Sequence, residues 1–92
     1  MHDWTLVSIV VDWIKGSVSF RLKNSKSEDV SVVVPKFTEL CVPRREDWGP
    51  SVSVNSVGGP SDLPNGNQRL TIEMQTGDVI SVEAPSITMP AA

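Results

Sequence analysis

The residues best suited to chemistry gather in one segment, REDWGPSVSVN, which runs from Arg45 to Asn55 and follows Arg44. An arginine fork can hold a carboxylate or a phosphate, and a tryptophan beside arginines is typical of a binding anchor. Small hydroxyl and amide side chains that alternate with valine form a strand face able to make hydrogen bonds. The pattern predicts a binding surface made of Arg44, Arg45, Trp48, Ser51, Ser53 and Asn55.

The same residues have a structural interpretation as well. The arginines can pair with Glu46, Asp47 or an acid on a neighbouring strand, which stabilises an exposed surface only weakly. Trp48 can fold back over the rim of the core, which would accommodate its large apolar ring. We favour the structural interpretation for the arginines and for Trp48, and the binding interpretation stays open.

Catalytic chemistry has little support in the sequence. A serine nucleophile needs a positioned base, and the single histidine, His2, lies far from the serines of the segment. His2 and Asp3 are adjacent, so on an extended strand they point to opposite faces and do not serve one centre. A metal site needs three or four suitable ligands, and the chain has one histidine and one cysteine. We predict no catalytic residue, no metal and no cofactor.

Composition restricts the class of protein and its partners. The 92 residues suffice for one hydrophobic core, and a net charge of −3 argues against nucleic acid as a partner, which usually needs a basic face. No apolar run reaches the roughly 18 residues of a membrane-spanning helix, and the opening MHDWTLVSIVVDW lacks the basic start of a signal peptide. The lone cysteine, Cys41, suits the cytoplasm and is predicted to be a small buried hydrophobe. We expect a cytoplasmic protein that binds neither nucleic acid nor membrane.

Alternation with a period of two residues predicts strands along most of the chain. TLVSIVVDW and SVSFRLK form a hairpin around a glycine turn, and QRLTIEM and VISVEA form another around TGD. Further strands are expected in DVSVVV, KFTELCV and SVSVNSV, whereas residues 58–67, GGPSDLPNGN, are expected to form a surface loop.

The strand pattern predicts an all-β fold with a single domain over residues 1–85. About seven short strands, with no stretch of helical period, fit an antiparallel sandwich or a small barrel of six or seven strands equally well. Residues 86–92 are expected to be a disordered tail.

Two tryptophans are predicted to belong to the core. In the first strand Val7, Ile9, Val11 and Trp13 fall on one face, and the residues between them are of mixed character. The apolar face is therefore expected to be buried, with Trp4 and Trp13 covering ends of the core.

The segment HDWTLVSIVVDWIKGSVSFRL, residues 2–22, resembles the opening of small bacterial all-β proteins, and IEMQTGDVISVEA resembles them more loosely. Those proteins begin with His-Asp-(Ala/Trp), followed by a strand, an Asp, a Lys-Gly turn and a return strand. Some are grouped with the immunity proteins of polymorphic-toxin systems. The resemblance implies a bacterial, cytoplasmic, non-enzymatic protein that binds a partner, and it carries no site residues over to this chain.

Two functional hypotheses follow. The first is a β-domain that binds a protein partner or itself without catalysis, with SVSVNSV as an edge strand that could pair with its copy in a dimer. The second is a small-molecule binder or enzyme with a cleft near Trp48. In that case Arg44 or Arg45 would hold an anion, and Glu73 or Asp78 would act as acid or base.

Overall fold

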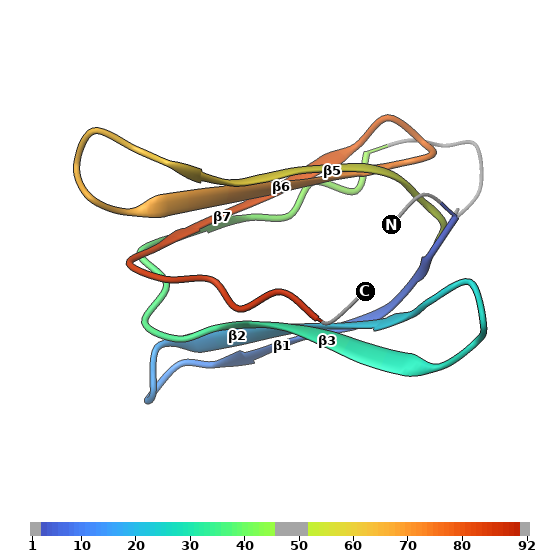
Figure 1. Cartoon of the computed structure of the whole chain (residues 1–92), viewed down its shortest axis with the longest axis horizontal. Helices are drawn as coiled ribbons and strands as arrows, with labels where there is room; N and C mark the ends of the chain where they lie inside the picture. Colours follow the sequence, from blue (N-terminus) through green and yellow to red (C-terminus); the bar gives the residue numbers. More distant parts are fainter. Residues whose placement is uncertain (1–2, 46–51, 91–92) are drawn as a thin grey trace.

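A computed structural model describes residues 3–45 and 52–90, and the described residues form seven antiparallel strands in two sheets. Figure 1 shows the sheets as two layers, one containing β1–β3 and the other β5–β7. The all-β architecture predicted from the sequence is confirmed, in the form of a sandwich. The strands are β1 (Thr5–Asp12), β2 (Ser17–Lys23), β3 (Asp29–Val34), β4 (Glu39–Cys41), β5 (Val54–Asp62), β6 (Gln68–Met74) and β7 (Val79–Ala84).

The two sheets differ in how the chain runs through them. The first sheet has the order β1-β2-β3, so its strands are neighbours both in sequence and in space. The second has the order β4-β7-β6-β5, in which β5, β6 and β7 form consecutive hairpins and β4 lies beside β7. This is a Greek-key order, with a long connection between the first two strands. The connection from β4 to β5 therefore joins opposite edges of the sheet.

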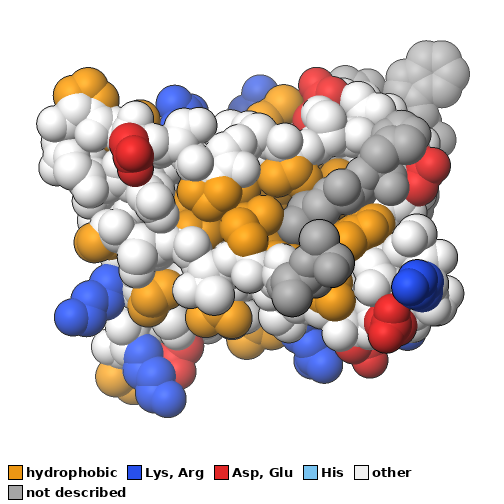
Figure 2. All heavy atoms as spheres, in the orientation of Figure 1, with side chains coloured by type: hydrophobic (Ala, Val, Ile, Leu, Met, Phe, Trp, Pro, Cys, Tyr) orange, Lys and Arg blue, Asp and Glu red, His pale blue; other side chains and the backbone are white. Residues whose placement is uncertain are grey.

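The core lies between the sheets and follows the two-residue period. On β2, Val18, Phe20 and Leu22 are buried, while Arg21 and Lys23 between and beyond them face the solvent. Figure 2 shows hydrophobic side chains gathered along the middle of one face of the molecule, with charged side chains around the periphery. All buried side chains of the described residues are hydrophobic: Val18, Phe20, Leu22, Val32, Val34, Val54, Leu70, Ile72, Met74, Ile80, Val82 and Ala84.

Backbone contacts near the start of the chain tie one sheet to the other. The amide of Asp3 donates to the carbonyl of Val54 at 2.9 Å, and the amide of Val54 donates to the carbonyl of Trp4 at 2.8 Å. One step further along, the amide of Leu6 donates to the carbonyl of Val52 at 2.8 Å. In Figure 1 the N-terminal strand accordingly rises from one layer to the other at the right-hand end.

The C-terminal segment lies against β3, where the sequence predicts a frayed tail. Thr88 and Val33 each donate an amide hydrogen to the other's carbonyl, at 3.0 and 3.1 Å. Ile87 and Met89 pack against the core. Figure 1 shows this segment between the two layers. The apolar residues that alternate with Thr88 give it a buried side, and this burial was missed in the sequence.

The loop predicted for residues 58–67 is wrong in its first half, because β5 continues to Asp62. Gly58 pairs with Thr71 and Ser61 pairs with Arg69, with a register shift between them that marks a bulge. The bulge contains Pro60, which has no amide hydrogen to donate. Because β5 is an edge strand, this position is tolerated without the loss of a hydrogen bond to a neighbouring strand. The turn itself is limited to residues 63–67.

The buried face predicted for the first strand is also wrong in part. A register shift between Leu6 and Ser8 interrupts the alternation, so that Leu6 and Ile9 pack against the core while Val7 is 55% exposed. Trp4 packs against the core as predicted. Trp13, by contrast, is 82% exposed, because it lies in the turn after β1 has ended.

Cys41 is a further correction, because it is exposed and not buried. In the three-residue strand β4 it pairs with Ser81, whose neighbours Ile80 and Val82 are buried. Cys41 and Ser81 therefore share the outer face of the sheet, and Leu40 is the residue of β4 that packs against the core.

We predict that Gly59→Ala destabilises the protein far more than Gly66→Ala. Both glycines have a positive φ, +92° and +87°, so both substitutions carry a backbone strain of about 1–2 kcal/mol. At Gly59 a Cβ would also lie 2.5 Å from the carbonyl oxygen of Arg69, whereas at Gly66 it would meet open space. We expect a loss in the free energy of unfolding of about 3 kcal/mol or more at Gly59, measured by urea denaturation. Equal losses at the two positions would contradict the bulge geometry.

Candidate functional site

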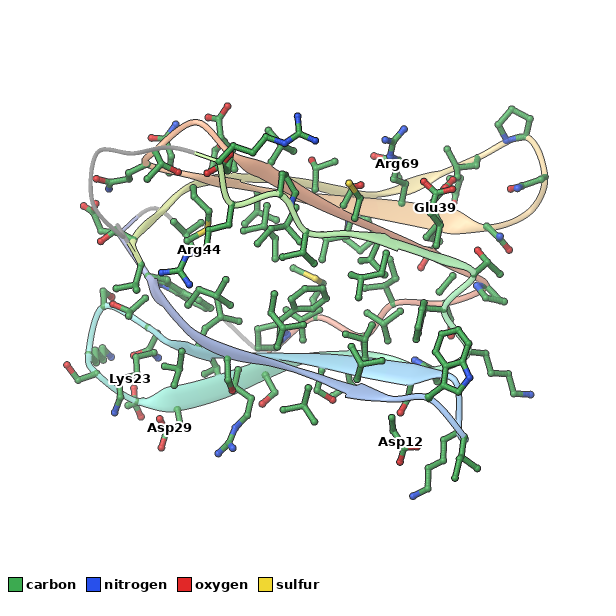
Figure 3. The ribbon with its side chains drawn as sticks, turned by 180° about the vertical axis from the view of Figure 1, so that it is seen from behind. Asp12, Lys23, Asp29, Glu39, Arg44 and Arg69 are labelled. Carbon is green, nitrogen blue, oxygen red and sulfur yellow. The ribbon has the colours of Figure 1, made fainter. Side chains whose placement is uncertain are left out.

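The predicted binding residues that the structure describes lie at one end of the second sheet. Trp48 and Ser51 lie outside the described residues. Figure 3 shows Arg44 on the segment that follows β4, at the end of the molecule where β1 begins. We call the group of polar residues at this end the β6–β7 corner: Asp3, Arg45, Ser53, Asn55, Glu73, Gln75 and Asp78. Its members come from segments distant in sequence: the order β4-β7-β6-β5 places the segment after β4 beside the β6–β7 turn, and a backbone hydrogen bond to Val54 brings Asp3 to the same end.

Asp78 is the centre of the first set of contacts in the β6–β7 corner. Its two carboxylate oxygens each accept a hydrogen bond from the backbone amide of Arg45, at 3.3 Å. The hydroxyl of Thr76 donates to the same carboxylate at 3.2 Å, within the turn between β6 and β7. The contact is made by the main chain of Arg45, so the predicted pairing of its guanidinium with an acid stays a prediction. The Asp78 carboxylate therefore joins the β6–β7 turn to the segment after β4 by hydrogen bonds.

Glu73 is the centre of the second set of contacts. The side-chain amide of Asn55 donates to Glu73 Oε1 at 2.6 Å, and the hydroxyl of Ser56 lies 3.4 Å from the same oxygen. The register of β5 and β6 shifts between Val54 and Ser56, which places Asn55 in a bulge. The bulge positions the Asn55 amide over the neighbouring strand, because bulges redirect side chains.

Gln75 joins the start of the chain to the corner. Its side-chain amide donates to a carboxylate oxygen of Asp3 at 2.8 Å, and its backbone amide donates to the carbonyl of Ser53 at 2.9 Å. Asp3 has a φ of +65°, a left-handed conformation that aspartate tolerates better than most residues. Asp3 accordingly lies in a turn, and its neighbour His2 lies outside the described residues.

The chemistry available in the corner follows from these contacts. Asp3, Glu73 and Asp78 accept hydrogen bonds from amides and hydroxyls of the chain itself, which is typical of carboxylates that hold local structure. In residues 3–45 and 52–90, His, Cys, Asp and Glu side chains form no group of three or more that could hold a metal ion. The corner brings Arg45, Ser53 and Asn55 into one hydrogen-bonded region with Glu73 and Asp78, as part of the fold.

A second surface, which the sequence did not single out, surrounds β1. Nine large hydrophobic residues are exposed among those described, and five of them belong to β1 or to the turn that follows it. The signal in the sequence is that Val10 and Val11 are adjacent, so the strand has apolar residues on both faces. We call this set the β1 surface: Val7, Val10, Val11, Trp13 and Ile14.

Comparison of the chain with models of protein families, with curated proteins and with solved structures gives no match. The resemblance of residues 2–22 to small bacterial immunity-like proteins therefore stays a prediction. Over the part of the chain that the structure describes, no helix has the length and apolar character needed to cross a membrane.

We predict that Asp78→Ala destabilises the protein and that Arg45→Ala does not. Asp78→Ala removes the acceptor for the Arg45 amide and for the Thr76 hydroxyl, and we expect a loss of about 1 kcal/mol in the free energy of unfolding. Arg45→Ala keeps the backbone amide that makes the contact, so the change should stay within about 0.5 kcal/mol. Chemical denaturation of the two variants measures both values. A larger loss for Arg45→Ala would mean that its guanidinium, and not its amide, matters to the corner.

Proposed function

We propose that this protein is a non-enzymatic β-domain of the bacterial cytoplasm that binds a protein, either a different chain or a second copy of itself. The observation that carries the proposal is the β1 surface. Exposed hydrophobic residues scattered singly are normal on a soluble protein, but several grouped along one edge strand and the turn after it favour an interaction site. Tryptophan in particular is enriched at protein interfaces, and Trp13 is 82% exposed.

The polar residues of the corner support the same proposal indirectly. A catalytic acid or base needs to reach a substrate, and a nucleophile needs a base beside it. Glu73 and Asp78 instead accept hydrogen bonds from Asn55 and from the Arg45 amide, which hold neighbouring segments of the fold. An immunity-like role, as the N-terminal resemblance implies, is one form that partner binding could take.

The competing hypothesis is a small-molecule binder or enzyme that uses the corner, with Arg44 or Arg45 holding an anion. We predict that a thermal-shift screen against anionic metabolites and divalent metal ions leaves the melting temperature of the protein unchanged. Ligand binding to the folded state raises the melting temperature, so a true ligand would be visible. A strong hit that is abolished by Arg45→Ala and kept by Arg69→Ala would overturn the proposal, because Arg69 lies at the opposite end of β6 from Glu73.

A further inference from the structure

Three of the four sheet edges carry a feature that hinders pairing with another strand. β3 is covered at Val33 by the segment around Thr88, and β4 is only three residues long. β5 is interrupted by two register shifts and contains Pro60. Short strands, bulges, prolines and covering segments are the devices by which proteins protect sheet edges. The edge of β1 lacks them beyond Ser8.

The β1 edge is open along a regular run, Ser8 to Asp12, in which the terminal Asp12 is the one charged residue. After the register shift, Ser8 to Asp12 pair continuously with β2 on one side. On the other side, no backbone hydrogen bond joins these residues to any other described residue. Asp3 and Asp12 are the nearest charges, and every residue between them is neutral. Figure 3 shows β1 along the near edge of its sheet, with Asp12 at the end away from Arg44. Such an edge is a template for another β-strand.

We propose that β1 pairs with β1 of a second copy, antiparallel, about a two-fold axis at Val10; this deepens the proposed function and rests on it. An isologous interface needs a surface that is complementary to itself. The run Ser8–Asp12 is centred on Val10, so antiparallel pairing places Val10 opposite Val10 and Ile9 opposite Val11. The result is one sheet of six strands, three from each copy.

The charges and the exposed residues fit this register. Asp12 lies opposite Ser8 of the partner, so the two aspartates are not brought together, and like charges directly opposite would be unfavourable. Val11 is on the core side of the sheet, but it is 45% exposed because β1 is an edge strand. In the dimer, Ile9 of the second copy would lie beside Val11. Trp13 of one copy comes level with Val7 of the other, and both are exposed in the single chain. Four of the five residues of the β1 surface thus gain a neighbour.

The interface is small, and this determines how it will behave. A ladder of five residues from each copy is at the low end of specific protein interfaces, where binding is weak and reversible. We therefore expect a monomer–dimer equilibrium that shifts with protein concentration and not an obligate dimer.

Sedimentation velocity over a wide concentration range tests the proposal with Val10→Lys and Val33→Lys. Val10 and Val33 are outward-facing valines at opposite ends of one cross-strand row through Ser19, and they are 50% and 42% exposed. Lysine is accommodated at both positions in the single chain, but at Val10 it would oppose its own copy across the axis. We expect wild type and Val33→Lys to dimerise alike, and Val10→Lys to raise the dissociation constant by about tenfold or more.

Disulfide trapping provides a second measurement that does not depend on weakening the interface. In a Cys41→Ser background, Val10→Cys should form a covalent dimer on mild oxidation, because the two cysteines would meet at the axis. Val33→Cys in the same background should stay monomeric.

The outcomes separate this inference from the proposed function. A monomer at all concentrations that also binds no other protein would contradict both. A monomer that binds a different protein through the β1 surface would overturn the dimer and leave the proposed function standing. A dimer that Val10→Lys does not weaken, or that Val33→Lys weakens equally, would show that the copies meet elsewhere. Binding of the chain to lipid vesicles, lost in Trp13→Ser, would replace a protein partner with a membrane surface.

Discussion

Burial of the inward-facing side chains between two sheets is the constraint on which the rest of the structure depends. Among the described residues the buried set is entirely hydrophobic. Hydrophobic burial is strong but non-directional, so it favours any arrangement that keeps the same faces inward. It sets which side of each strand points to the core, and it leaves strand order to other interactions. Hydrogen bonds at the edges and corners must therefore select the topology.

The β6–β7 corner is the clearest case of such selection. Its side chains link the start of the chain, the segment after β4 and the turn between β6 and β7. The contacts of Arg45 with Asp78 and of Gln75 with Asp3 join segments that lie far apart in the sequence, and a hydrogen bond of this kind typically contributes about 1 kcal/mol or less to stability. Polar residues that the sequence suggested for ligand binding, such as Arg45 and Asn55, take part in the folded chain in the contacts that join its segments.

The sequence predicted features that depend on local pattern and missed those that depend on distant contacts. The hairpins β1–β2 and β6–β7 are correct because alternation and a glycine turn determine them within a few residues. The bulge after Leu6, the extension of β5 and the position of Thr88 depend on partners far along the chain, which no local period encodes. The same holds for the site. The sequence identified Arg45 and Asp78 separately as candidate site residues. The hydrogen bond between the Arg45 amide and Asp78 depends on the strand order, which places the segment after β4 beside the β6–β7 turn.

The bridge between Val33 and Thr88 has a consequence for the order of events during biosynthesis. Thr88 leaves the ribosome after every residue of both sheets, and the bridge between Thr5 and Ser53 also joins segments made far apart in time. Contacts between distant segments slow folding, because a long loop must close before they contribute. While the chain is being made, β2 and β3 can therefore pair before the segment around Thr88 exists. The free backbone edge of β3 at Val33 is uncovered during that time. In that interval the nascent chain is most exposed to chaperones and to unwanted association with its neighbours.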